Sequence, residues 1–152
     1  MFKSNLLKGE KGFTLVEMVI VIIIIGILAS IVLVGLGSFR SRGRDARRIA
    51  DLRQTQNALE LYYTANQAYA PVSGSDTWAS LTTALTGGGI GITTISNDPL
   101  PANTYQYGVS ADRQNYVLMA TLEDGNNPSL RDDTDGTFYG INCADPNYCV
   151  QF

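Results

Sequence analysis

The feature that most constrains this chain is a run of 22 residues without a charged side chain, from Met18 to Phe39. As a helix rising about 1.5 Å per residue, the run extends about 33 Å, which is enough to cross the hydrocarbon core of a bilayer. A cleaved secretory signal is the alternative, but its apolar region has only about 7–15 residues. We therefore predict a membrane-spanning helix.

Charge is divided unevenly along the 152 residues. Six arginines fall between residues 38 and 60, whereas nine of the 14 acidic residues lie after Glu60, so a basic neck precedes an acidic body. The sequence has no histidine, which excludes Ser-His and Cys-His nucleophile pairs and HExxH zinc sites. No other pattern resembles an activated nucleophile or an acid–base pair, so we predict that the chain is not an enzyme.

The segment before the apolar run reads Lys11-Gly12-Phe13-Thr14-Leu15-Val16-Glu17. Together with that run, it resembles the class III signal of type IV pilins and of the pseudopilins of type II secretion. The resemblance implies that a prepilin peptidase cuts after Gly12 and then methylates the new amino terminus at Phe13. Residues 1–12 are then a short basic leader that is removed.

The resemblance places Glu17 at the fifth position of the processed chain, where the family carries a glutamate that serves assembly. Read without the family, Glu17 is an interfacial carboxylate at the end of a membrane helix. Intramembrane acids are costly and usually functional, which favours a carboxylate reserved for a partner charge. That partner is the amine of Phe13, in the same chain or in an incoming subunit, and the sequence leaves both arrangements open.

The two flanks of the apolar run bear on orientation. Three lysines lie within residues 1–12 and five arginines within residues 40–48, so the positive-inside rule places the large domain in the cytoplasm. The resemblance implies the opposite orientation, with the head outside the cytoplasm. We follow the resemblance, which predicts a single-pass cytoplasmic (inner) membrane protein before assembly and a cell-surface filament or periplasmic pseudopilus afterwards.

Residues 44–63 resemble the second half of a long pilin helix, especially that of major pseudopilins. Their apolar positions form one stripe, as expected for a helix packed on a sheet: Ile49, Leu52, Leu59 and Tyr63. We expect an α+β fold in which a long N-terminal helix packs on a small antiparallel sheet. The predicted divisions are a transmembrane and assembly helix at 13–39, an amphipathic helix at 40–64 and a globular head at 65–152.

Within the head, the sequence predicts a short helix over residues 76–85, capped by Ser75 or Asp76. Its apolar residues Trp78, Leu81 and Leu85 share one face and are assigned to the core. Two strands, at 105–109 and 116–122, are predicted to form an antiparallel hairpin, and residues 137–141 are the candidate for a third strand.

Two small clusters remain in the head. Cys143 and Cys149 are predicted to form a disulfide, because the domain is expected outside the cytoplasm. Asp132, Asp133 and Asp135 precede Gly136, and such oxygen ligands beside a glycine turn suit calcium, which some pseudopilins hold in a comparable loop. The full EF-hand spacing is missing, so a solvated acidic turn is the other interpretation. We expect no other cofactor.

The arginines of the neck admit three interpretations. They bind lipid phosphates at the membrane surface, pair with acidic heads of neighbouring subunits in a filament, or hold nucleic acid phosphates. No aromatic ladder accompanies them, so nucleic acid ranks last. The arginines in question are Arg40, Arg42, Arg44, Arg47 and Arg48.

The resemblance predicts a structural subunit of a type IV pilus-like filament, polymerised through its apolar helix. It implies as partners further copies of the chain, the prepilin peptidase, the membrane lipid, and an inner-membrane assembly platform with its ATPase. The alternative within the family is the major pseudopilin of a type II secretion system. The alternative from another class is a solitary membrane-anchored binding domain that forms no polymer.

Overall fold

The computed structural model describes residues 12–152, apart from the side chains of residues 33–36. The predicted leader therefore lies outside the described residues except for Gly12. Helix α1, Leu15–Asn66, covers both the apolar run and the amphipathic segment, as expected. The chain forms two compact units that meet between Ser38 and Phe39, so α1 contributes to both. The predicted division at residues 39, 40 and 64 stays a prediction.

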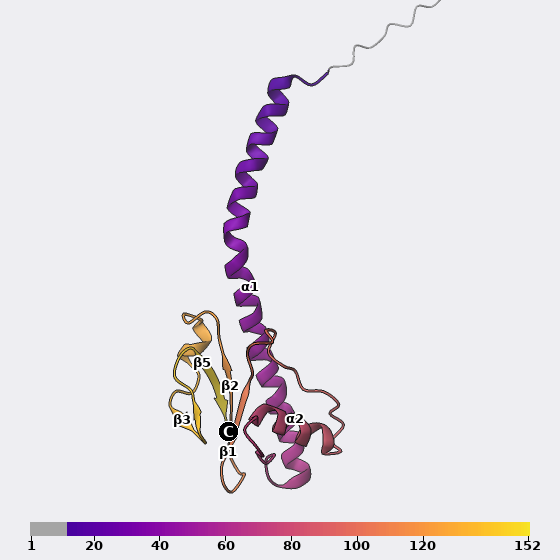
Figure 1. Ribbon diagram of the computed structural model, residues 1–152, viewed down its shortest axis with the longest axis vertical. Coiled ribbons are helices and arrows are strands. Elements are labelled where there is room, and N and C mark those ends of the chain that lie inside the picture. The colour runs from indigo at the N-terminus through magenta and orange to yellow at the C-terminus, as the bar shows by residue number, and fades with distance from the viewer. Residues whose placement is uncertain (1–11) are drawn as a thin grey trace, which may run out of the picture. The chain divides into compact units, whose positions relative to one another are not determined.

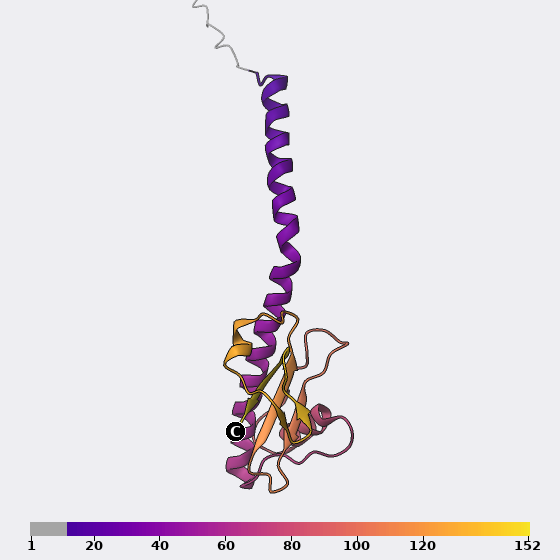
Figure 2. The same ribbon diagram turned by 90° about the vertical axis from the view of Figure 1, so that its left-hand side faces the viewer.

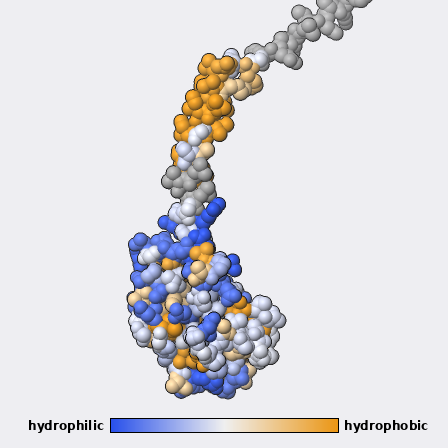
Figure 3. All heavy atoms as spheres, in the orientation of Figure 1, coloured by the Kyte–Doolittle hydropathy of each residue, from blue (hydrophilic) through white to orange (hydrophobic). Residues whose placement is uncertain are grey.

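In the first unit, the apolar side chains of α1 that the structure describes are all exposed, with Leu15 at 80% and Ile31 at 67%. This stretch is the orange part of the molecule in Figure 3. By length and composition the helix is able to cross a membrane, and none of its most apolar window is buried. Aliphatic side chains exposed on every side favour lipid or the core of an assembly as their surroundings.

The second unit is built on a three-stranded antiparallel sheet (Figure 1). Its strands are β1, Gln106–Val109, β2, Tyr116–Thr121, and β5, Asn147–Gln151, in the order β1-β2-β5. The β1–β2 hairpin pairs Tyr107 with Leu118 and confirms the predicted hairpin. Helix α2, Thr77–Gly87, confirms the predicted short helix, and Asp76 caps it by accepting a hydrogen bond from the Ala79 amide.

The main core lies between one face of the sheet and the helices, which Figures 1 and 2 show beside it. Leu52 and Leu59 of α1 are fully buried there. The predicted core residues of α2 join them: Trp78, Leu81 and Leu85. Alternate residues of β2 point to opposite faces, so Leu118 faces the helices while Val117 and Met119 belong to a second, smaller core.

The predicted third strand at residues 137–141 is wrong. That segment instead contributes to a separate two-stranded ribbon of β3, Thr137–Phe138, and β4, Ile141–Asn142. Tyr139 and Gly140 both have positive φ angles, 50° and 84°, and form the tight turn between the two strands. The third strand of the sheet is β5, which pairs with β2 and places Cys149 opposite Met119. One 3₁₀ turn, Pro128–Arg131, completes the head.

Candidate functional site

The predicted cleavage point lies in an extended segment just before α1. Gly12, Phe13 and Thr14 are exposed and precede the helix, which begins at Leu15. A Cβ atom added at Gly12 meets no described atom within 4 Å, so the backbone there is open on the side where a side chain would stand. The bond between Gly12 and Phe13 therefore has the accessible, non-helical backbone that a peptidase requires.

Thr14 and Glu17 cap the first turn of α1. The Thr14 amide and its hydroxyl both donate to Glu17 Oε2 at 2.8 Å, and the Glu17 amide donates to Thr14 Oγ1 at 3.2 Å. This reciprocal arrangement is a capping box, in which residues three apart satisfy each other's free backbone groups. Among residues 12–152, no hydrogen bond reaches the other carboxylate oxygen, Oε1. Glu17 therefore has one oxygen engaged in the cap and one available to a partner.

A buried guanidinium joins α1 to two loops of the head. The Arg48 side chain has no exposed surface and binds Asp98 through both carboxylate oxygens, at 2.7 and 3.0 Å. It also donates to Asp45 and to Glu123, each at 2.7 Å. Asp45 in turn accepts hydrogen bonds from the Glu123 and Asp124 amides, at 2.9 and 3.0 Å. The buried charge is thus fully surrounded by opposite charge, which such burial requires.

Arg44 completes this cluster from the preceding turn of α1. Its Nε donates to Glu123 Oε1 at 2.7 Å, and its terminal nitrogen contacts the other oxygen. Hydrogen bonding from Arg44, with a second contribution from Arg48, lowers the pKa of Glu123 from 4.5 to about 2. Of the five arginines between residues 40 and 48, Arg44 and Arg48 are therefore committed to carboxylates inside the head. The other three, Arg40, Arg42 and Arg47, are exposed.

The carboxy-terminal region gathers the second predicted cluster. Cys143 and Cys149 form a disulfide with an S–S distance of 2.04 Å, and both are buried in the smaller core. The loop between them carries Asp145. Carboxylate oxygens of Asp133, Asp135 and Asp145 lie within 4.8 Å of one another. The structure therefore brings together two of the three predicted acids and replaces Asp132 with Asp145.

Asp133 has the environment expected of a ligand in this group. Its Oδ2 accepts a hydrogen bond from the Cys149 amide at 2.9 Å, while its Oδ1 is buried without a hydrogen-bond partner. Burial raises the pKa of Asp133, and the nearby carboxylates of Asp135 and Asp145 raise it further. A cation would relieve both the repulsion and the unsatisfied oxygen, and oxygen donors of this kind suit calcium. The donor set therefore fits the ion.

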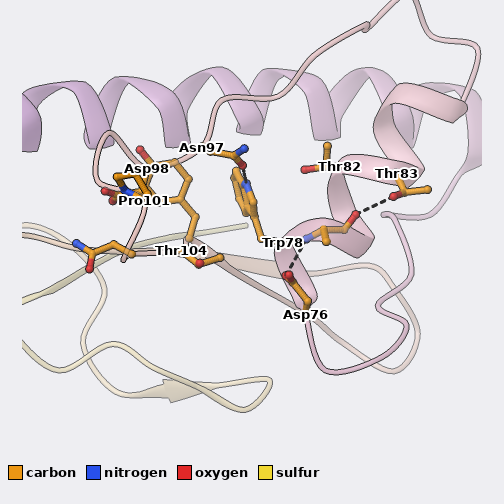
Figure 4. Close-up of a pocket in the computed structure, with 11 residues that line it drawn as sticks. Asp76, Trp78, Thr82, Thr83, Asn97, Asp98, Pro101 and Thr104 are labelled. Atoms are coloured by element: carbon orange, nitrogen blue, oxygen red, sulfur yellow. Dashed lines mark hydrogen bonds between the residues drawn. The ribbon is translucent and has the colours of Figure 1, made fainter.

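A hollow of about 640 Å³ lies between α2 and the loop before β1 (Figure 4). Three of its polar side chains already have structural partners. Asp76 caps α2, Asp98 binds Arg48, and Asn97 accepts a hydrogen bond from the Trp78 indole at 3.1 Å. No nucleophile stands beside a base among the lining residues, so the hollow offers no arrangement for acid–base or covalent catalysis.

Two contacts at these sites were missed in the sequence. The spacing Thr14-x-x-Glu17 before an apolar run is a recognisable capping signal, so the first contact was open to prediction. The partnership of Asp45 and Arg48 with Glu123 carried no such signal, because Glu123 lies 75 or more residues further along the chain.

Comparisons with known proteins agree with the residues at the start of α1. Residues 7–33 match the model of the prokaryotic N-terminal methylation motif. Type II secretion system core protein G of Aeromonas hydrophila is 36% identical over 62 residues, 41% of this chain and 43% of that protein. The corresponding protein of Escherichia coli K12 is 37% identical over 60 residues, 40% of this chain and 41% of that protein.

A relative with a different role is similar over the same share of this chain. The type IV wide pilus major component PilA4 of Thermus thermophilus is 40% identical over 68 residues, 41% of this chain and 52% of that protein. The matches thus span about half the length of these relatives or less. No solved structure matches the chain.

Proposed function

We propose that this chain is a type IV pilin or pseudopilin and, within that family, a structural subunit of a type IV pilus-like filament. Members of this family are structural proteins and not enzymes, although their amino-terminal motif is the substrate of a peptidase. The observation that carries the proposal is the start of α1, where an accessible Gly12–Phe13 bond precedes an exposed apolar helix and Glu17 caps the first turn of that helix.

In this proposal, prepilin peptidase cuts after Gly12 and methylates Phe13, while α1 anchors the subunit in the cytoplasmic membrane with its head outside the cytoplasm. An assembly platform and its ATPase then move the subunit into the filament. There the exposed aliphatic side chains of α1 pack against those of neighbouring copies instead of lipid. The exposed aliphatic side chains of the first unit support this step.

Glu17 has two tasks in this scheme. One oxygen keeps the capping box closed, and the other meets the cationic amine that cleavage creates on Phe13. An amino-terminal amine has a reference pKa near 7.7–8.0, so most of it is charged at neutral pH. An unpaired charge inside an apolar assembly is strongly unfavourable, and an opposed carboxylate offsets part of that penalty.

The second candidate is the major pseudopilin of a type II secretion system. Its similarity to the type II secretion proteins of Aeromonas hydrophila and Escherichia coli favours this candidate, as does the acidic group of Asp133, Asp135 and Asp145. We propose that these three residues, with Asp145 in the place predicted for Asp132, hold a calcium ion that ties the disulfide loop to the segment before β3. Either type of filament accommodates that role.

Mass spectrometry of the mature chain tests the shared part of the proposal. We expect a protein that starts at N-methyl-Phe13, and an intact Met1 in assembled material would overturn the assignment. Electron microscopy of sheared surface material then separates a filament subunit from a solitary anchored domain. Deleting the gene and measuring surface filaments and protein secretion separates the two candidates, because a pilin loss removes filaments and a pseudopilin loss removes secretion.

A further inference from the structure

Three of the five arginines between residues 40 and 48 remain exposed: Arg40, Arg42 and Arg47. We propose that they form a headgroup collar, a ring of cations that binds the phosphates of anionic phospholipids around α1 where the apolar run ends. The proposal rests on the membrane-anchored state proposed above and is independent of the type of filament. It concerns the subunit before assembly.

The first argument is that these cations are only weakly engaged by the protein. The Arg42 side chain is 68% exposed and lies 3.6 Å from Asp124, and that of Arg47 is 60% exposed and lies 3.6 Å from Asp51. Exposed pairs at such distances contribute little to stability and are easily exchanged. Among residues 12–152, no ion pair reaches Arg40. All three guanidinium groups are therefore free to bind an external anion.

The second argument is their position along α1. Arg40 directly follows Phe39, an exposed aromatic residue that closes the apolar run. Arg47 lies seven residues further on, about 10 Å along the axis. In the structure the Arg47 side chain contacts Asp51, four residues further along, and this exposed pair leaves the long side chain able to turn back toward Phe39 when a phosphate replaces Asp51. A guanidinium beside an apolar span is well placed for the phosphate layer of a bilayer.

The third argument is their distribution around the helix. Arg40 and Arg47 are two turns apart and share one side of α1, while Arg42, two residues from Arg40, falls on the opposite side. Between the two sides lies the buried face with Arg48 and Leu52. A bilayer surrounds a spanning helix with headgroups, so it meets cations on both sides at once. One acidic patch on a neighbouring subunit does not, which favours lipid.

The full-length processed protein is to be reconstituted into phosphatidylcholine bilayers that contain spin-labelled phosphatidylglycerol or spin-labelled phosphatidylcholine. The relative association of the two labels with the protein measures its preference for the anionic headgroup. We expect a several-fold preference for phosphatidylglycerol, with each collar arginine contributing up to about fivefold at low salt. Molar sodium chloride shortens the screening length to about 3 Å and should remove most of this preference.

Substitutions make the test specific. We expect R40Q/R42Q/R47Q to bring the preference for phosphatidylglycerol close to one. R40K/R42K/R47K should retain it, because the binding depends on the positive charge of the side chain and not on the planar guanidinium. R53Q is the matched control. Arg53 is exposed on the same helix but lies six residues beyond Arg47, about 9 Å further from the apolar run. R53Q should show the same preference for phosphatidylglycerol as the unchanged protein, within experimental error.

Three outcomes would overturn the proposal. One is equal association of both lipids with the unchanged protein, and another is an unaltered preference in the glutamine variant. The third is loss of the preference in inorganic phosphate but not in chloride of equal ionic strength, which would reveal a site for free phosphate. If the glutamine variant lowers filament yield while lipid preference is unchanged, the collar contacts another subunit instead. The three lipid measurements do not depend on whether the proposed filament forms.

Discussion

Arg48 and Asp98 are 50 residues apart in the sequence, yet they form a two-pronged ion pair in which both side chains are almost completely buried. The pair fastens α1 to the loop before β1. Removing Arg48 leaves the Asp98 carboxylate buried without an opposite charge, which typically destabilises a protein by about 3–5 kcal/mol. Together with Leu52 and Leu59 in the main core, the pair holds the second half of α1 to the rest of the head.

We predict that Arg48→Met lowers the free energy of unfolding of the head by about 3–5 kcal/mol, as measured by urea denaturation of residues 39–152. Both cores lie within these residues, so the segment contains the apolar contacts that it needs. Arg53→Met, on the exposed side of the same helix, should change it by less than about 0.5 kcal/mol. Equal effects of the two substitutions would contradict the role given to Arg48.

The second prediction concerns the stability of the head at acidic pH. Because the pKa of Glu123 is lowered from 4.5 to about 2, its ion pairs stabilise the head fully above about pH 4.5. That contribution is lost as the pH falls from 4.5 toward 2, since the unfolded chain binds the proton first. We expect Glu123→Gln to be less stable than the unchanged head at pH 7 and the difference to narrow below pH 4.5. Urea midpoints between pH 7 and pH 2.5 measure it, and a constant difference would argue against the ion pairs.

The third prediction separates the two tasks of Glu17. Glutamine also serves in a capping box, so Glu17→Gln keeps the cap and removes only the charge. We expect Glu17→Gln and Glu17→Ala to insert in the membrane and fold normally but to yield few filaments, with partial rescue by Glu17→Asp. Thr14→Ala, which weakens the cap and keeps the charge, should retain more filaments than Glu17→Gln.

Filament yield in a strain without wild-type subunits measures these effects. Normal yield from Glu17→Gln would make Glu17 a capping residue without a further role. Equal losses of filament yield in Thr14→Ala and Glu17→Gln would show that assembly depends on the helix cap and not on the charge of Glu17.

The fourth prediction concerns calcium. An ion that binds only the folded head stabilises it by mass action, so millimolar calcium should raise the Tm of the head relative to chelator. Asp145→Asn should abolish this shift, while Asp132→Asn, which changes an acid outside the group, should preserve it. Identical melting curves with and without calcium would leave only an acidic turn. Loss of the shift in Asp132→Asn would favour the ligand set predicted from the sequence.

The fifth prediction concerns the disulfide. Cys143 and Cys149 are six positions apart, and cross-linking so short a loop stabilises a protein by about 2 kcal/mol on the chain-entropy account. Replacing both with serine should lower the free energy of unfolding by about that amount, as measured by urea denaturation. Alkylation under denaturing, non-reducing conditions should leave both cysteines unlabelled in the unchanged protein.

The local elements of this protein were readable from the sequence because their causes are local. An uncharged run of 22 residues predicts a helix that lies in a membrane or in the core of an assembly. The apolar stripe at helical spacing after it predicts that the helix continues into the head. The cap at Asp76 and the strand patterns predicted the bounds of α2 and of the β1–β2 hairpin to within one or two residues. The motif around Gly12 and Glu17 indicated the family on which the proposed function rests.

The tertiary structure decided what depends on partners distant in the sequence. Residues 137–141 turn at Tyr139 and pair with each other, and β5 occupies the edge of β2 beside which a third strand lies. The composition of the acidic group depended on the disulfide loop that carries Asp145, and the division of the neck arginines depended on Asp98 and Glu123. A charged side chain looks the same in a sequence whether it is solvated or buried. Only the folded chain determines which opposite charge lies within 3 Å of it.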